Sequence, residues 1–149
     1  MKRCIVTYAE GAHEELLDVG LPTYKNFAQR HSYDVVVGTK MTSLPAAWNK
    51  VPLLLDALEK YEEVVWFDCD LVVVDPSEDF PPMQDGVLHA MVRHFECCSE
   101  VPNSGVWRLR RQTYLRAVDL LNRMLDLEVF TNHGWWEQAA LLTLMGYTV

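Results

Sequence analysis

Short apolar runs and longer amphipathic segments alternate along the 149 residues of the chain. Short runs rich in β-branched residues are typical of buried strands, and apolar residues that recur every three or four positions are typical of helices packed on a core. Strands are therefore predicted at 3–9, 33–37, 63–67, 71–74, 87–93 and 105–109, with a last one beginning at 147–149. Helices are predicted at 11–30, 47–61, 111–127 and 135–145. A break is expected in the first helix at residues 20–22, because Pro22 suits the first turn of a new helix.

The order of these segments predicts an α/β fold. The first three strands are separated by long helical crossovers, so they are expected to pair in parallel. Mixed elements follow them, and neither an internal repeat nor a linker interrupts the chain. We therefore predict an α/β/α sandwich with a mixed, mainly parallel sheet, formed by one domain over residues 1–149.

Composition narrows the classes of partner. Half of the residues are hydrophobic and 23% are charged, which suits a buried core rather than disorder. The net charge of −8 argues against nucleic acid and anionic membranes, because phosphate groups attract basic surfaces. A small phosphorylated ligand is still compatible with this negative charge, since a metal ion can neutralise the phosphate groups. No run approaches the roughly 18–20 apolar residues of a membrane span, and the first apolar run is too short for a signal peptide. A cytoplasmic location is therefore expected.

The four cysteines match no zinc-binding or redox spacing. Cys4 and Cys69 lie in apolar, strand-like runs and are interpreted as small core residues. Cys97 and Cys98 are adjacent in a predicted loop and are interpreted as free thiols. This usage fits a reducing compartment.

The sharpest chemical signal is a pair of carboxylates, Asp68 and Asp70, directly after the third predicted strand. Ligands of open α/β sheets collect beyond the carboxyl ends of the strands. Residues i and i+2 of extended backbone point to the same side, so both acids can face one cation. Hard oxygen ligands suit Mg²⁺ or Mn²⁺. An Asp-x-Asp turn is the alternative, although apolar flanks on both sides place these acids at the edge of a core.

The segment from Trp66 to Val74 resembles the Asp-x-Asp segment of GT-A-fold glycosyltransferases. Further motifs occur in the order found in the galactosyl-, mannosyl- and xylosyltransferase family of fungal and plant Golgi. The glycogenin-like family shares three of them more distantly. The resemblance implies a GT-A fold, a Rossmann-like nucleotide-diphospho-sugar transferase architecture, over nearly the whole chain. Its other motifs are Tyr24-x-x-Phe27-Ala28-x-x-His31-x-Tyr33-Asp34, Trp48-x-Lys50, Asn103-Ser104-Gly105-Val106 and Trp136-Glu137-Gln138.

The same resemblance implies a binding site for a nucleoside diphosphate sugar, with Asp68 and Asp70 holding Mn²⁺ or Mg²⁺ on the diphosphate. Lys50 would approach the diphosphate or support its pocket, and a solvated helix charge is the alternative. The remaining donor contacts would come from the end of the first strand, which would line the base and ribose, and from a turn that would touch the sugar. Tyr8 is equally compatible with an ordinary rim tyrosine. These donor residues are Thr7, Tyr8, Ala9, Asn103, Ser104 and Gly105.

Glu137 and Gln138 stand at the start of the last predicted helix, where they are the implied catalytic pair. By resemblance, the acid would lie by the anomeric carbon or acceptor and stabilise positive charge in the transition state, while Gln138 would hydrogen-bond the sugar. Stabilisation of the helix dipole is the alternative role of Glu137. The two preceding residues, Trp135 and Trp136, could stack on a sugar ring or belong to the core.

The chain departs from these families after the last predicted helix. The histidine that completes the metal shell in those families is absent, and so is most of the C-terminal half that binds the acceptor. The expected function is metal-dependent transfer of a hexose or pentose from a nucleoside diphosphate sugar to a glycan or other hydroxyl acceptor, with retention of configuration implied by resemblance. A non-catalytic module that binds a nucleotide sugar is the first alternative. A nucleotidyltransferase ranks last, because residues 9–13 supply no glycine-rich phosphate loop.

Overall fold

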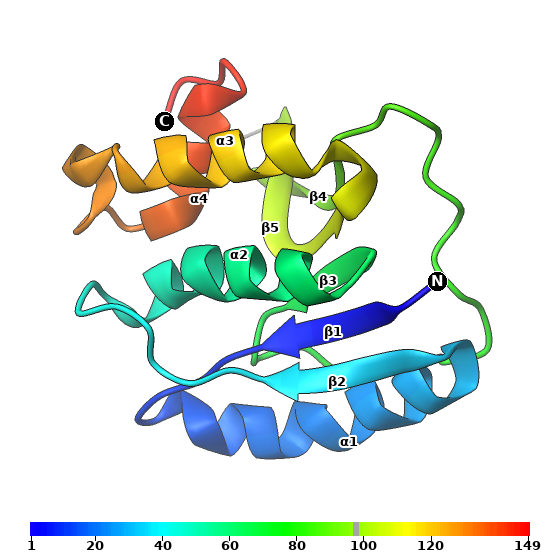
Figure 1. The fold of residues 1–149 in the computed structure, drawn as a ribbon. Coiled ribbons are helices and arrows are strands. Elements are labelled where there is room, and N and C mark those ends of the chain that lie inside the picture. Colours follow the sequence, from blue (N-terminus) through cyan, green and yellow to red (C-terminus); the bar gives the residue numbers. More distant parts are fainter. Residues whose placement is uncertain (97–98) are drawn as a thin grey trace.

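The computed structural model describes residues 1–96 and 99–149, and five strands form its single sheet in the order β2-β1-β3-β5-β4 (Figure 1). β1 pairs in parallel with both β2 and β3, whereas β5 runs antiparallel to both β3 and β4. The mixed, mainly parallel sheet and the parallel pairing of the first three strands are therefore confirmed. The strands are β1 Arg3–Thr7, β2 Tyr33–Val37, β3 Glu63–Phe67, β4 His89–Glu96 and β5 Ser99–Arg110.

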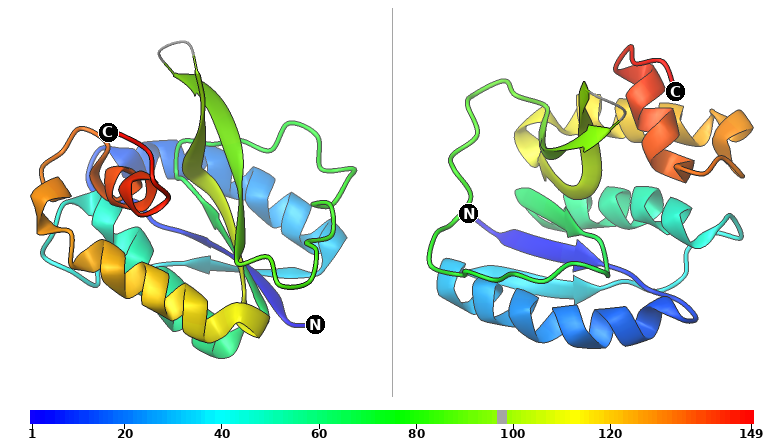
Figure 2. Two further views of the ribbon diagram at one scale, coloured as in Figure 1. Left: turned by 90° about the horizontal axis from the view of Figure 1, so that it is seen from above. Right: turned by 180° about the vertical axis from the view of Figure 1, so that it is seen from behind.

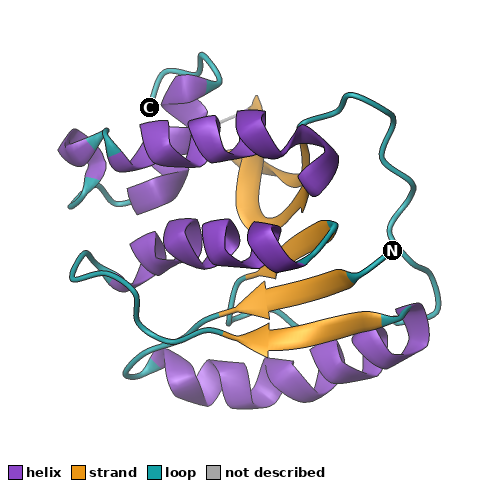
Figure 3. Ribbon diagram, in the orientation of Figure 1, coloured by secondary structure: helices purple, strands orange, loops and turns teal. Residues whose placement is uncertain are grey.

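Helices cover both faces of this sheet, so the α/β/α sandwich is confirmed (Figure 3). α1 lies on one face, and α2 and α3 lie on the other. The β4–β5 hairpin extends beyond the helical layers (Figure 2). The helices are α1 His13–His31, α2 Lys50–Lys60, α3 Tyr114–Leu125 and α4 Trp136–Leu144, with short 3₁₀ helices at Ala46–Asn49, Arg111–Thr113 and Glu128–Phe130. No helix among the described residues combines the length and apolar character of a bilayer-spanning segment.

Alternation along the buried strands divides the core into two clusters, because successive side chains of a strand point to opposite faces. On β3, Val64 and Trp66 face the cluster formed with α2, α3 and α4. Val65 and Phe67 face the cluster formed with α1. Cys4 is buried in the first cluster, as predicted, and Cys69 packs at the edge of the second. Cys97 and Cys98 lie outside the described residues.

The predicted break in the first helix is wrong, because α1 continues through Pro22. A proline inside a helix removes one backbone hydrogen bond and normally ends or kinks it. Here burial of Tyr24 and Phe27 against the sheet holds the following turns in place. Tertiary packing therefore overrides the local preference of the proline.

The segment at 71–74, predicted as a strand, is irregular. Its alternation is nevertheless real, since Leu71 and Val73 pack on the α1 cluster while Val72 and Val74 are exposed. The segment makes its polar contact with a helix instead of a sheet: the backbone N–H of Val73 donates to Thr23 Oγ1 over 3.0 Å. Residues 147–149 form no strand either.

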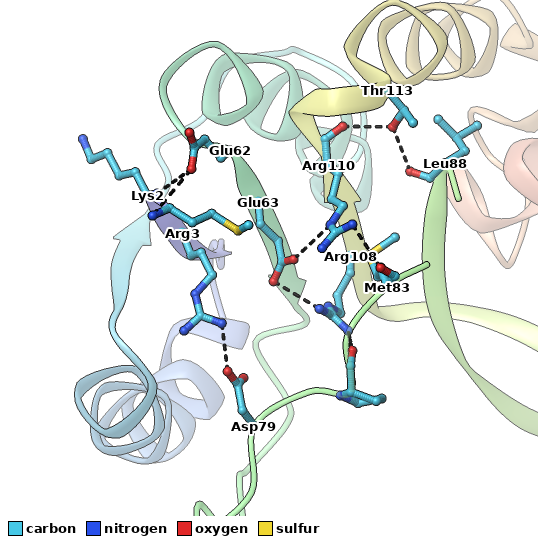
Figure 4. A network of polar contacts seen from close by, with 12 residues as sticks. Lys2, Arg3, Glu62, Glu63, Asp79, Met83, Leu88, Arg108, Arg110 and Thr113 are labelled. Carbon is cyan, nitrogen blue, oxygen red and sulfur yellow. Dashed lines mark hydrogen bonds and ion pairs between the residues drawn. The ribbon is translucent and has the colours of Figure 1, made fainter. Parts of the chain in front are cut away.

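A buried polar network closes the end of the sheet where β3 begins (Figure 4). Glu63 accepts hydrogen bonds from Tyr33 and from Arg108. Arg3 pairs with Asp79 over 2.8 Å. Arg108 also donates to the carbonyl oxygen of Pro81, so the segment after the Asp-x-Asp motif is anchored to the far end of the sheet.

His89 makes the stability of the fold depend on pH. The indole N–H of buried Trp107 donates to His89 Nδ1 over 3.2 Å, so the imidazole must be neutral on that side. Burial lowers the pKa of His89. The unfolded chain therefore binds a proton before the folded one, and stability is lost as pH falls below about 6.5. The slope from this group is at most about 1.4 kcal/mol per pH unit.

We expect His89→Gln, which keeps an acceptor for Trp107, to flatten this pH dependence. Urea unfolding of both proteins between pH 7.5 and pH 5 checks it. The difference between the two proteins isolates His89 from the other histidines. Parallel profiles for the wild type and the variant would contradict the prediction.

Candidate functional site

A cavity of about 410 Å³ opens at the carboxyl ends of β1 and β3. This is the position at which open α/β sheets bind ligands. Its walls come from five separate segments of the chain: the residues after β1, the start of α2, the residues after β3, the middle of β5 and the start of α4. The polar and aromatic lining residues are Tyr8, Glu10, His13, Lys50, Trp66, Asp68, Asp70, Asn103, Ser104, Trp135, Trp136, Glu137 and Gln138.

Nine of the eleven residues predicted for the site line this cavity, and Thr7 and Gly105 do not. Thr7 is fully buried behind the wall, where its carbonyl accepts the N–H of Gly38 over 2.8 Å. Gly105 is buried beneath Asp68, whose N–H donates to the carbonyl of Gly105 over 2.8 Å.

The Asn103-Ser104-Gly105 segment lies inside β5 and enters a β-bulge there, so it is not the predicted turn before a strand. The register between β4 and β5 shifts here: Met91 pairs with Trp107, and Val92 pairs with Asn103. Asn103 Oδ1 accepts the N–H of Gly105 over 2.7 Å. A Cβ at Gly105 would lie 2.9 Å from Asp68 Oδ2, so lack of space, and not a left-handed backbone, requires glycine at this position.

Lys50 is the centre of the site, with only 3% of its surface exposed. Its ammonium group lies 3.0 Å from Asp68 Oδ1 and 2.6 Å from Glu137 Oε1. It also donates to the carbonyl and hydroxyl oxygens of Ser104, over 3.2 Å and 3.0 Å. A buried charge needs such partners, because desolvation of an unpaired ammonium is costly. Lys50 therefore joins three of the predicted segments.

The charges of this cluster fix the protonation of its members. Burial alone would lower the pKa of Lys50, but the negative charges of Asp68 and Glu137 raise it above its usual value. Burial opposes ionisation of Asp68 too, yet the Lys50 ammonium and a hydrogen bond from Trp66 hold the pKa of Asp68 below its usual range. The site therefore keeps a charged lysine and a charged aspartate at neutral pH.

Ser104 connects the β5 bulge to the start of α4. Its backbone N–H donates to Gln138 Oε1 over 3.1 Å, and its hydroxyl lies 3.1 Å from Glu137 Oε1. Glu137 is only 3% exposed. The predicted catalytic pair is thus held by polar contacts on one side and borders the cavity on the other.

The Asp68–Asp70 loop is held from beneath by α1. Tyr24 Oη lies 2.8 Å from the carbonyl oxygen of Asp68 and 2.7 Å from that of Leu71, so its hydroxyl proton bridges the two ends of the loop. Burial raises the pKa of Tyr24 to about 12, which keeps that proton in place. One turn earlier, Gly20 allows the backbone at Leu71 to approach the helix more closely than a Cβ would permit.

Sequence reasoning missed two features of the cavity. Trp66 donates its indole N–H to Asp68 Oδ1 over 2.6 Å, and the i, i+2 spacing of these two residues on extended backbone was the available signal. Trp136 has a positive φ of 40°, a conformation that costs of order 1–3 kcal/mol for a residue other than glycine. No local pattern indicates that conformation.

Comparisons with known proteins support the fold. No protein-family model and no curated protein matches the sequence. Among solved structures, a glycosyltransferase involved in glycosylation of the major capsid of PBCV-1 aligns with a TM-score of 0.77 and 11% identity, over 99% of this chain and 77% of that one. The glycosyltransferase GlyE of Streptococcus pneumoniae aligns with a TM-score of 0.69 and 16% identity, over 97% of this chain and 43% of that one.

A third match is the Drosophila β-1,4-galactosyltransferase 7, whose structure is a complex with manganese, UDP-Gal and xylobiose. It aligns with a TM-score of 0.56 and 13% identity, over 78% of this chain and 52% of that one. The chain thus spans about half the length of the second and third structures and most of the first. The resemblance deduced from the motifs is confirmed at the level of structure: this chain has the GT-A-like fold of glycosyltransferases.

Proposed function

We propose that the chain is a glycosyltransferase that moves a hexose or pentose from a nucleoside diphosphate sugar to a hydroxyl group of a glycan or other acceptor. The observation that carries the proposal is the convergence of distant motifs on one cavity. Residues separated by up to 87 positions, Lys50 and Glu137, are in direct contact there. Short motifs that matched by chance would have no reason to meet.

The order of the strands supports one orientation of the bound nucleotide sugar across the sheet. Tyr8 and Ala9 follow β1, Asp68 and Asp70 follow β3, and Ser104 lies on β5. These strands are neighbours in the order β1-β3-β5. Base, diphosphate and sugar are joined in that same order in a nucleotide sugar. We infer that the donor lies across the strand ends, with its base at Tyr8 and its sugar beside Ser104.

Charge supports a divalent cation in this site. Among the described residues, the cavity lining holds the carboxylates of Glu10, Asp68, Asp70 and Glu137 but only one ammonium group, that of Lys50. A diphosphate would be repelled by such a lining unless a cation accompanied it.

The residues present fit a cation that shares its shell with substrate. Asp68 Oδ1 already contacts Lys50 and Trp66, which leaves Oδ2 for a metal ion, and Asp70 is exposed beside it. Among the described residues, no three His, Cys, Asp or Glu side chains are grouped so that they could hold a metal ion by themselves. Mg²⁺-like sites commonly use one or two carboxylates and complete their shell with phosphate oxygens and water. A bound Mn²⁺ or Mg²⁺ would stabilise negative charge on the departing diphosphate.

The residues around the sugar have separate roles in this proposal. Gln138 and Ser104 offer hydrogen-bonding groups that orient the sugar, and their mutual contact restricts both. Glu137 brings a negative charge to the same wall, where it would favour the positive charge that develops at the anomeric carbon. Lys50 holds Asp68 and Glu137 at a fixed separation. The resemblance of the motifs favours retention of configuration.

Nucleotide binding tests the proposal. We expect UDP or GDP to bind only in the presence of Mn²⁺, as measured by calorimetry, and Asp70→Ala to weaken that binding at least about tenfold. Asp70 is exposed, so the substitution leaves the core intact. A donor that binds but is neither transferred nor slowly hydrolysed would instead favour the non-catalytic module.

Asp119→Ala is the matched control for this experiment. Asp119 is an exposed aspartate on α3 that makes a surface ion pair with Arg123, and it is outside the cavity lining. Nucleotide affinity should be unchanged in this variant. Binding that survives both removal of the metal and the Asp70→Ala substitution would overturn the proposed metal site.

A further inference from the structure

Trp136 is a large aromatic side chain placed where neither packing nor backbone preference accounts for it. It is 43% exposed, whereas Trp48, Trp66 and Trp107 are almost fully buried. Its positive φ of 40° is unfavourable for a side chain with a Cβ. A glycine or asparagine at this position would expose less apolar surface and would adopt the positive φ more easily. The presence of tryptophan here therefore indicates a functional constraint.

Several contacts impose this conformation. The backbone N–H of Trp136 donates to the carbonyl of His133 over 3.0 Å, and the N–H of Trp135 donates to His133 Nδ1 over 3.1 Å. On the other side, Glu137 is fixed by its ion pair with Lys50. Trp136 is therefore held between a tight turn and a buried ion pair, and it is one of the residues that line the cavity.

The position of Trp136 separates it from the aromatic residue at the base end. Tyr8 follows β1, whereas α4 contacts β5 through Gln138 and Ser104. β3 lies between β1 and β5, so the two walls stand about two strand spacings, roughly 10 Å, apart. With the base at Tyr8, the donor sugar reaches the α4 wall, and the next group along the cavity is the acceptor.

We propose that Trp136 is the stacking platform for a pyranose ring of the acceptor. This inference rests on the proposed function and adds the class of acceptor to it: a carbohydrate, not a peptide hydroxyl. The flat, apolar indole face matches the C–H face of a pyranose, while Gln138 on the same cavity offers a polar group to its hydroxyls. The unfavourable backbone keeps the ring presented to the cavity before the acceptor arrives.

Methyl glycosides of glucose, galactose and mannose are suitable probes, titrated with Mn²⁺ and UDP present. We expect a saturable change in tryptophan emission of the wild type with at least one of them, since Trp136 is the most exposed indole. By calorimetry, Trp136→Ala should weaken that glycoside at least about tenfold, and Trp136→Phe should keep most of the affinity. UDP affinity should stay within about twofold in both variants.

The unfolding temperature of Trp136→Gly distinguishes a functional from a structural role of the indole. If the indole stabilised the fold, this substitution would lower the unfolding temperature. We expect this variant to unfold at the wild-type temperature or above, because it relieves the positive φ. A lower unfolding temperature, a loss of UDP affinity in Trp136→Ala, or no saturable response to any glycoside in a protein that binds UDP would each overturn the inference. If the wild type binds no nucleotide, the proposed function fails, whereas a saturable glycoside response at Trp136 would still support the platform.

Discussion

Replacing Lys50 with methionine is expected to destabilise the protein by about 3–5 kcal/mol and to abolish nucleotide binding. The substitution removes the only buried positive charge beside Asp68 and Glu137 among the described residues. Glu137 would then remain buried as an uncompensated carboxylate, and Ser104 would lose two hydrogen bonds. Urea unfolding gives the loss of stability, and calorimetry with UDP and GDP gives the loss of binding.

Lys60→Met is the matched control, because Lys60 lies on the same helix in an exposed ion pair with Asp56. Such pairs contribute about 0.3–0.5 kcal/mol, so this variant should be nearly as stable as the wild type. A double variant, Lys50→Met with Glu137→Gln, should regain part of the lost stability but none of the binding. Equal stability of Lys50→Met and Lys60→Met would mean that the buried ion pair does not form in solution.

Gly20→Ala is expected to destabilise the protein by about 1–3 kcal/mol, although alanine normally favours a helix interior by up to about 1 kcal/mol over glycine. The new Cβ would overlap the carbonyl oxygen of Leu71 and would lie 2.8 Å from Tyr24 Oη. Neither atom can retreat freely, because the Tyr24 hydroxyl bridges the carbonyls of Asp68 and Leu71. The Asp68–Asp70 loop would therefore have to move to make room for the new Cβ. Mn²⁺-dependent nucleotide affinity should then fall together with stability.

Gly134→Ala provides the comparison, since a Cβ at Gly134 has nothing within 4 Å. Its unfolding midpoint in urea should match that of the wild type. If Gly20→Ala were as stable as Gly134→Ala, the close approach between α1 and the loop would be absent, and the loop would need another support.

Much of the fold could be predicted from hydrophobic periodicity alone. The strands around Cys4 and Val65 are short and mostly apolar, and they lie in the interior of the sheet where both faces are covered. The errors occur where distant residues decide local structure. Pro22 remains helical because Tyr24 and Phe27 are buried on the sheet, and residues 71–74 alternate because they cover α1, not because they pair with a strand.

The members of the candidate site could be predicted better than their mutual contacts. Asp68, Lys50 and Glu137 were each indicated by a short motif, yet Lys50 and Glu137 are 87 positions apart, so their contact depends on the whole fold. The positive φ of Trp136 depends on the turn before it and the ion pair after it, and neither leaves a periodic signal. Sequence patterns thus indicate which residues matter, while the sheet order determines what each one touches.

The placement of β5 between β3 and β4 has a consequence for synthesis of the chain. A nascent chain emerges from its N-terminus, so the outer edge of β3 stays without its hydrogen-bonding partner until residues 106–110 have been made. Its exposed N–H and C=O groups can recruit strands of other chains during that interval. The ion pair of Lys50 forms later still, since its partner Glu137 follows β5 in the chain. The cluster around Lys50 therefore assembles only after the edge of β3 is covered, and a chain interrupted before residue 106 would expose an unpaired sheet edge without that cluster.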